Sequence, residues 1–158
     1  GNVHLESLAN EDRRREQLVI SEQSLRDYDI SVLVGDFNFC SERNFFFEAN
    51  KPLENEVLKE FLPNYVDGWP YVHKSDIESK RLMGYTFDSE VNKMFRKTEQ
   101  MRYDRVLTRC NKDICKLSDM ALVGVLPLKL EEIESPSTSM DQVWPSDHFG
   151  LLATFHIG

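Results

Sequence analysis

A chain of 158 residues can form one domain with a hydrophobic core and is too short for two comfortable ones. Its formal charge of −8, from 19 Lys and Arg against 27 Asp and Glu, excludes a broad basic footprint for duplex DNA and favours a focused site where a cation holds a phosphate. The sequence shows no apolar run of membrane-spanning length, no signal-peptide pattern and only three irregularly spaced cysteines, which predicts a nuclear or cytoplasmic protein with no membrane partner.

The first part of the chain alternates between strand and helix patterns. Residues 3–7 alternate apolar and polar side chains as a short strand does, and Asn10 can cap a charged amphipathic helix. Residues 30–34 form a β-branched apolar run, which predicts a buried strand. A second helix is expected from Pro52 to Phe61.

The second part contains more strand than helix. The stretch 64–81 has no clear periodicity and predicts an irregular loop, while 89–100 and 129–142 are polar connections. Further strands are expected at residues 84–88, 102–108, 120–125 and 149–157. Strands mixed with two helices indicate an α/β (α+β) layered domain that spans residues 1–158.

Two short polar motifs stand beside apolar strands. Asp36 and Asn38 directly follow the strand predicted at 30–34, and Asp147 and His148 precede the closing strand. Each motif alone is more typical of a turn or a structural pair than of a site. The prediction of a site therefore depends on their occurring together.

Hydrolysis of a phosphodiester explains why these residue types belong together. The reaction needs a cation that neutralises the phosphoryl oxygens and a positioned water as the nucleophile. Mg²⁺ takes oxygen ligands, which Asp36, Asn38 and Asp147 offer, whereas His148 can donate to a phosphate oxygen. A carboxylate on the other ring nitrogen tunes such a histidine, and Asp104 is the candidate for that partner.

Five motifs follow one another along nearly the whole chain: Val3-His4-Leu5-Glu6-Ser7, Gly35-Asp36-Phe37-Asn38, Gly84-Tyr85-Thr86-Phe87-Asp88, Arg102-Tyr103-Asp104-Arg105 and Pro145-Ser146-Asp147-His148-Phe149-Gly150-Leu151-Leu152. In this order they resemble the endonuclease/exonuclease/phosphatase superfamily, and most of all its 5′-tyrosyl-DNA phosphodiesterase branch. The resemblance implies part of a four-layer αββα sandwich, the second half of the family fold.

The resemblance implies a catalytic role for each matched polar position. Asp36 would orient or deprotonate the attacking water, and Asn38 would hold water or phosphate beside it. His148 would contact the scissile phosphate, with Asp104 orienting its ring. Asp147 would help to hold the metal, Mg²⁺ or alternatively Mn²⁺.

The resemblance also implies contacts to the substrate. His4, as a further catalytic residue, and Ser7 would contact phosphate oxygens, and Phe87 and Tyr103 would wall a groove for a single DNA strand. Other interpretations remain open, namely a surface histidine for His4 and core packing for the two aromatic residues. The run Phe45–Phe47 is expected to pack in the core. One basic cluster either steers a DNA strand toward the site or is simply solvated; it consists of Lys93, Arg96, Lys97, Arg102 and Arg105.

The implied function is Mg²⁺-dependent hydrolysis of the 5′-phosphotyrosyl bond between DNA and a protein adduct, a DNA-repair reaction on a single-stranded 5′ end. The alternatives are another phosphodiesterase or nuclease of the superfamily, or a catalytically inactive fragment that acts as an interaction module. The family's N-terminal half carries an Asn motif and a metal-binding Glu that nothing in this chain matches. We therefore expect efficient catalysis to require that half or a second chain.

Overall fold

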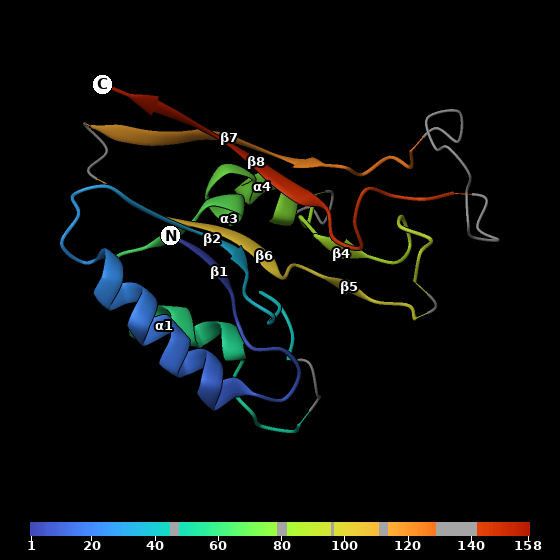
Figure 1. Ribbon diagram of the computed structural model, residues 1–158, viewed down its shortest axis with the longest axis horizontal. Coiled ribbons are helices and arrows are strands. Elements are labelled where there is room, and N and C mark those ends of the chain that lie inside the picture. The colour runs from blue at the N-terminus through green and yellow to red at the C-terminus, as the bar shows by residue number, and fades with distance from the viewer. Residues whose placement is uncertain (45–47, 79–81, 96, 111–113, 129–141) are drawn as a thin grey trace.

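A four-stranded sheet lies at the centre of the computed structural model, which describes residues 1–158 except 45–47, 79–81, 96, 111–113 and 129–141 (Figure 1). The Phe45–Phe47 run and most of the polar loop expected at 129–142 lie outside the described residues. In spatial order the strands of this sheet are β1 (Asn2–His4), β2 (Ser31–Asp36), β6 (Asp104–Arg109) and β3 (Val66–Asp67).

The pairing within this sheet brings distant parts of the sequence together. β1 runs parallel to β2, with His4 opposite Asp36, and β6 runs antiparallel to β2, with Asp104 opposite the same Asp36. The carboxyl ends of β1 and β2 and the beginning of β6 therefore meet at one edge, where three of the predicted polar residues stand.

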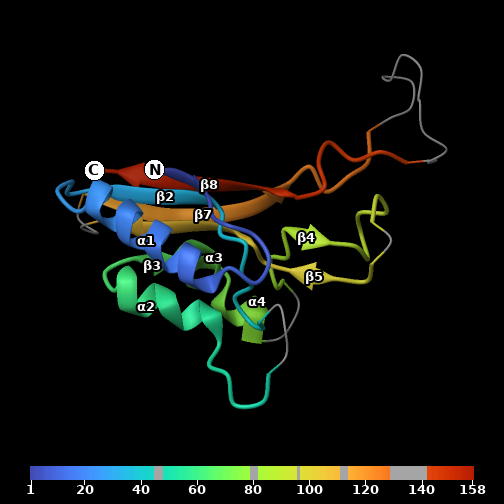
Figure 2. The same cartoon turned by 60° about the horizontal axis from the view of Figure 1, so that its bottom comes forward.

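Helices cover one face of the sheet and a second sheet covers the other (Figures 1 and 2). Helix α1 (Glu11–Leu25) and helix α2 (Val57–Phe61) bury Leu18 and Val57 against Leu33 of β2. The neighbouring residues Val32 and Val34 point the other way, because successive side chains of a strand alternate between faces. They pack in the core beneath β7 (Cys115–Val123) and β8 (Gly150–Ile157), which pair with each other. The predicted α+β class is confirmed.

The prediction of an irregular loop at 64–81 is wrong in part, because this segment contains β3 and two short helices, α3 (Gly68–Val72) and α4 (Lys74–Glu78). Trp69 of α3 is almost fully buried among β6 and β7 side chains. Tertiary packing of this single aromatic residue, rather than a local pattern, organises the segment.

The other predicted strands and helices are present apart from differences at their ends, and β5 (Gln100–Met101) is an additional strand at the end of the predicted polar connection. A short 3-10 helix, η1 (Glu54–Glu56), precedes α2. β4 (Phe87–Asp88) pairs with β5 (Gln100–Met101), and β7 begins at Cys115, before the predicted start at residue 120. In the described part of the chain, no helix is long and apolar enough to cross a membrane.

Candidate active site

The edge of the central sheet holds a cluster of two carboxylates and one imidazole. Asp36 ends β2, Asp104 begins β6, and His148 lies just before β8. The donor atoms of these three residues all lie within 4.8 Å of one another. The structure thus brings together residues from three motifs that are far apart in the sequence, as predicted.

The turn after β2 orders the first motif. Gly35 has a φ of 125°, and a side chain on it would collide with the carbonyl oxygen of Val3 in β1, so glycine is required there. Asn38 adopts a left-handed φ of 55°, which Asn tolerates well. Its backbone N–H donates to Asp36 Oδ1 at 2.8 Å, and its Nδ2 donates to the carbonyl of Leu5 at 2.7 Å. Asn38 is therefore both a turn residue and a neighbour of the site.

Asp104 and His148 form a direct hydrogen-bonded pair. His148 Nδ1 lies 2.7 Å from Asp104 Oδ2, and both side chains are about one-fifth exposed, at 22% and 23%. Burial by itself lowers the pKa of His148, but the hydrogen bond and charge of Asp104, with smaller contributions from Asp36 and Asp147, raise it overall. A protonated imidazole is thus favoured, with Nε2 as the nitrogen that can donate to an anion.

Asp36 has the opposite character, because its environment makes ionisation harder. Burial raises the pKa of this carboxyl, the N–H of Asn38 opposes the rise, and the negative charge of Asp104 adds to it. His4 Nε2 lies 3.6 Å from Asp36 Oδ2, although the His4 side chain is 77% exposed. His4 therefore stands at the rim of the cluster, whereas Asp36 lies inside it.

Aromatic rings line the other side of His148. The Phe87 ring centre lies 5.3 Å from that of His148 in an edge-on arrangement, and the Tyr103 ring stacks at 6.0 Å. Tyr103 is buried and also packs against Cys40 and Met101, so it is a core residue with one face toward His148. Phe87 is only half-buried and is better placed to meet a ligand.

Two predicted residues lie outside the cluster. Asp147 is exposed, and its carboxylate accepts a hydrogen bond from Ser146 at 3.2 Å. Ser7 lies in the loop after β1, and this loop is held by the buried Arg14, which donates to the carbonyls of Glu6 and Leu8 at 2.7 and 2.8 Å.

The predicted basic cluster is wrong for two of its members. Arg102 and Arg105 are buried and donate to the carboxylate of Asp67, at 2.7 to 2.9 Å. They pair with Asp67 rather than Asp104, and neither presents its charge to a ligand. Lys93 and Lys97 are exposed, and Arg96 lies outside the described residues.

Two buried polar residues near the site were not predicted from the sequence. Thr86 accepts hydrogen bonds from the backbone at the start of β6, and Asn92 donates to the carbonyl of Ser146 at 2.9 Å. Both are completely buried. The Thr86 position belongs to one of the five motifs, whereas Asn92 sits in a polar stretch that gives no signal of its own.

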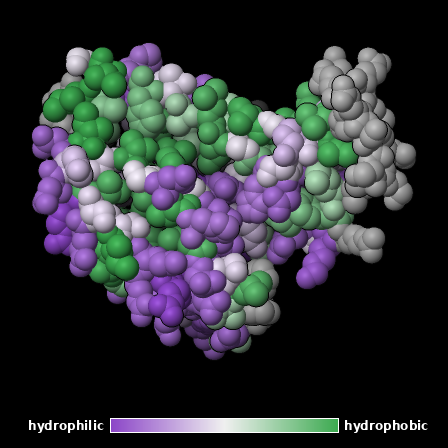
Figure 3. All heavy atoms as spheres, in the orientation of Figure 1, coloured by the Kyte–Doolittle hydropathy of each residue, from purple (hydrophilic) through white to green (hydrophobic). Residues whose placement is uncertain are grey.

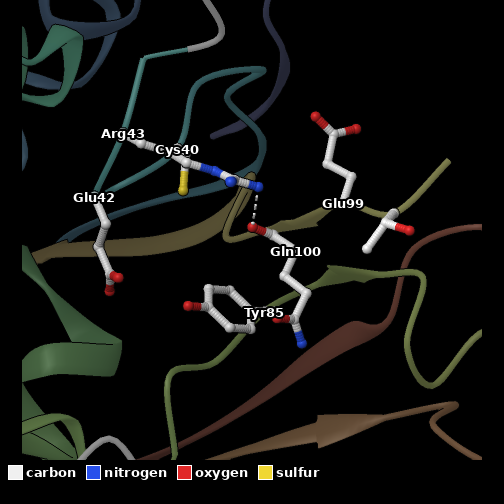
Figure 4. Close-up of a pocket in the computed structure, with 7 residues that line it drawn as sticks. Cys40, Glu42, Arg43, Tyr85, Glu99 and Gln100 are labelled. Carbon is white, nitrogen blue, oxygen red and sulfur yellow. Dashed lines mark hydrogen bonds between the residues drawn. The ribbon is translucent and has the colours of Figure 1, made fainter. Parts of the chain in front are cut away.

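A separate hollow of about 180 Å³ opens beside the aromatic residues (Figure 4). Arg43 crosses it and donates to the backbone oxygen of Gln100 at 2.9 Å, and Tyr85 faces it from the opposite side. Glu42 and Glu99 both line this hollow, so it is poorly suited to a phosphate. None of the predicted site residues lines it.

The donor set suits a hard divalent cation in part. Mg²⁺ is commonly held by one or two carboxylates together with water, and the Asp36 and Asp104 oxygens provide such ligands. One oxygen of Asp104 is, however, already engaged by His148. The cluster can therefore hold a hydrated cation, and further oxygen ligands would complete it.

No protein-family model and no curated protein matches this chain. Several solved structures do. TDP2 from D. rerio, complexed with single-strand DNA product, is 21% identical with a TM-score of 0.65, over 98% of this chain and 54% of that one. A mannosyl-6-phosphatase from Bacteroides thetaiotaomicron is 11% identical with a TM-score of 0.58, over 99% and 50%.

An endonuclease/exonuclease/phosphatase family protein from Bacteroides thetaiotaomicron is also similar, at 12% identity and a TM-score of 0.54, over 98% of this chain and 46% of that one. The chain therefore has the fold of endonuclease/exonuclease/phosphatase proteins, and the predicted resemblance is confirmed at the level of the fold. It spans about half the length of the solved structures that it matches.

Proposed function

We propose that this chain forms the phosphate-binding half of a Mg²⁺-dependent phosphodiesterase that removes a tyrosyl adduct from a 5′ DNA phosphate. The observation that carries the proposal is the cluster of Asp36, Asp104 and His148, whose donor atoms lie within 4.8 Å. A base and a cationic donor at this spacing can act on two sides of one phosphate.

Asp36 acts on the attacking water. A general base is most effective when its pKa lies near the working pH, and burial moves the pKa of Asp36 upward in that direction. The N–H of Asn38 fixes one carboxylate oxygen, which leaves the other to accept the proton of the water. His4, close to that second oxygen, can orient the same water or a phosphate oxygen.

His148 acts on the phosphate. Asp104 holds Nδ1 and thereby fixes the orientation of the ring, so that Nε2 donates to a phosphoryl oxygen where negative charge develops. Ser7, on the loop that Arg14 holds, contributes a second donor at the rim.

The metal, Mg²⁺ or Mn²⁺, would neutralise phosphoryl oxygens when bound. In this chain the carboxylates of Asp36 and Asp104 offer oxygen ligands at the cluster, and the exposed Asp147 is a further proposed ligand. We propose that residues outside the matched half of the fold, or a second chain, supply the remaining oxygen ligands.

Two observations support the proposed class of substrate: the aromatic side chain beside His148, and the ligand of a solved structure with a similar fold. Phe87 borders His148 and can pack against a base or a sugar of a single strand. The D. rerio structure with single-strand DNA product supports DNA as the ligand. DNA repair in the nucleus is the corresponding biological setting.

The proposal is tested on this chain together with the remaining half of the fold, using a single-stranded oligonucleotide that carries a 5′-phosphotyrosine and measuring release of tyrosine in the presence of Mg²⁺. Replacement of His148 by Ala should lower turnover roughly 10²- to 10³-fold, because the donor to the developing charge is lost. Asp36→Asn should lower it by about 10²- to 10⁴-fold through loss of the base.

The matched control is His156→Ala, because His156 is an exposed histidine of β8 outside the cluster. This variant should keep its activity. Mannose 6-phosphate and an abasic duplex, tested in parallel, separate the tyrosyl activity from the other activities of the fold. Absence of turnover even with the remaining half of the fold supplied would instead support an interaction module.

A further inference from the structure

Thr86 connects both members of the Asp104–His148 pair through the backbone. Its Oγ1 accepts the N–H of Asp104 at 3.0 Å and that of Tyr103 at 3.2 Å. Its own carbonyl accepts the N–H of Phe149, the residue after His148, at 2.7 Å. Because the Thr86 side chain is completely buried, water cannot replace any of these acceptors.

This connection matters because strand pairing does not set the position of Asp104 relative to His148. Asp104 begins β6 in the central sheet, whereas His148 precedes β8, which pairs with β7 in a different sheet. Within the described part of the chain, no ladder joins β6 to β8. The spacing of the pair therefore depends on residues that bond to both segments.

Asn92 supports the same arrangement from the His148 side. Its Nδ2 donates to the carbonyl of Ser146, and its Oδ1 accepts the N–H of Met94 at 3.1 Å. It does not reach β6, however. Thr86, in contrast, bonds both to Asp104 and to Phe149, the residue after His148.

We infer that Thr86 is a positioning residue that sets the distance between Asp104 and His148. This inference rests on the proposed function. Valine matches threonine in shape but offers no acceptor, so Thr86→Val leaves the buried Tyr103 amide and the partly buried Asp104 amide without this acceptor and allows the start of β6 to shift. Displacement of a catalytic group by about 1 Å can cost roughly a hundredfold in rate.

The test compares Thr86→Val with Thr86→Ser, which keeps the hydroxyl. We expect Thr86→Val to lower kcat about ten- to a hundredfold with KM changed less than about twofold, and Thr86→Ser to stay within about threefold of wild type. Thr108→Val is the matched control, because Thr108 is a buried threonine at the other end of β6 whose hydroxyl lies 3.7 Å from the Cys110 thiol. It should leave kcat unchanged.

A second measurement does not depend on activity. The ¹⁵N spectrum of the His148 ring at one fixed pH reports whether Nδ1 is hydrogen-bonded to Asp104, and Thr86→Val should change this signal while Thr86→Ser and Thr108→Val keep it. If wild type proves inactive on the oligonucleotide even with the remaining half of the fold supplied, the proposed function fails, but this spectrum still decides the role of Thr86.

Retention of both kcat and the ring signal by Thr86→Val would overturn the inference, and so would a serine variant as impaired as the valine variant. If circular dichroism shows Thr86→Val to be unfolded, Thr86→Cys replaces it, because a thiol is a weak acceptor of similar size. The kcat and the ring signal of the cysteine variant should then lie between those of the serine variant and complete loss. Wild-type values for the cysteine variant would again overturn the inference.

Discussion

The charge of Asp104 contributes to raised pKa values at both Asp36 and His148, with opposite consequences for the charge of the two side chains. The carboxylate of Asp104 raises the pKa of the His148 imidazole through a hydrogen bond of 2.7 Å. The same charge contributes, after burial, to the raised pKa of Asp36. Asp104 therefore favours a cationic donor at His148, and it adds to the effect of burial that makes ionisation of Asp36 harder.

The Asp104–His148 pair predicts a pH-dependent stability. The pKa of His148 is raised above its ordinary value of 6.5, so folding favours the protonated ring. This stabilisation is fully present below pH 6.5 and is lost as the pH rises through the folded-state pKa. The loss of unfolding free energy caused by Asp104→Asn should thus be larger at about pH 5.5 than at about pH 8.5 in urea titrations.

The control for this prediction is Asp119→Asn, which removes an exposed carboxylate of β7. Its effect on unfolding should be small and equal at the two pH values. An Asp104→Asn effect that is independent of pH would show that the pair adds nothing to folding through the histidine.

Sequence reasoning found the charged residues of the site but not the residues that hold them. Asp36, Asp104 and His148 are recognisable because each carries chemistry in a motif beside a strand. Thr86 and Asn92 act through backbone hydrogen bonds, and a buried threonine cannot be told from any strand threonine before the fold is known. For the same reason, Arg102 and Arg105 were assigned to the surface although they are buried.

At the scale of elements, a buried ion cluster joins β3 to the strand that carries Asp104. Burial alone would raise the pKa of Asp67, but the charges and hydrogen bonds of Arg102 and Arg105 lower it overall. Arg105 also donates to the carbonyls of Arg102 and Phe39, both at 2.9 Å. These bonds fix the start of β6 against the loop that follows β2.

Removal of the Asp67 charge should therefore destabilise the fold strongly. Asp67→Asn leaves two buried guanidinium groups without their counter-charge, and we expect a loss of about 3–5 kcal/mol in urea unfolding. In contrast, Glu56→Gln breaks an exposed pair with Lys59 and should cost no more than about 1 kcal/mol. Equal losses for the two variants would contradict the role of the buried cluster.

Strongly patterned elements were predictable, whereas short elements shaped by packing were not. The expected strands at 30–34 and 149–157 correspond to β2 and β8, because their apolar residues give a local signal. α3 and α4 have five residues each, too few for a helical period to show. Their structure depends on contacts, such as those of Trp69, with strands distant in the sequence.

At the scale of the whole molecule, the chain combines an acidic composition with two separate cores on the faces of one sheet. Hydrophilic side chains gather over α1, and hydrophobic ones over β7 and β8 (Figure 3). Val123, Leu152 and Ile157 of these two strands are 43%, 58% and 76% exposed. Neither surface offers the extended basic stripe by which many proteins hold nucleic acid.

Binding of an oligonucleotide should accordingly depend on the metal more than on general charge attraction. The net charge is −8, and Arg102 and Arg105 are buried and paired with Asp67, so general attraction of phosphates should be weak. The logarithm of the single-strand binding constant should fall with the logarithm of salt concentration with a slope of about −1.4 to −2.1, the value for two or three phosphate contacts.

Fluorescence anisotropy at several salt concentrations measures this slope. Chelation of divalent cations should weaken binding by more than about tenfold, because the scissile phosphate loses its counter-charge. A steep slope, together with binding that is indifferent to chelator, would point to a basic surface instead.

The pairing of Asp36 with Asp104 across β2 and β6 also has a consequence for biosynthesis. The intervening segment contains η1, α2, β3, α3, α4, β4 and β5, so a growing polypeptide carries Asp36 out of the ribosome long before its partner exists. Closure of so long a loop is entropically unfavourable until the distant strand arrives. A nascent chain stalled before β6 would thus expose β2 as an open edge, and chaperones that shield such edges should find their client at that stage of translation.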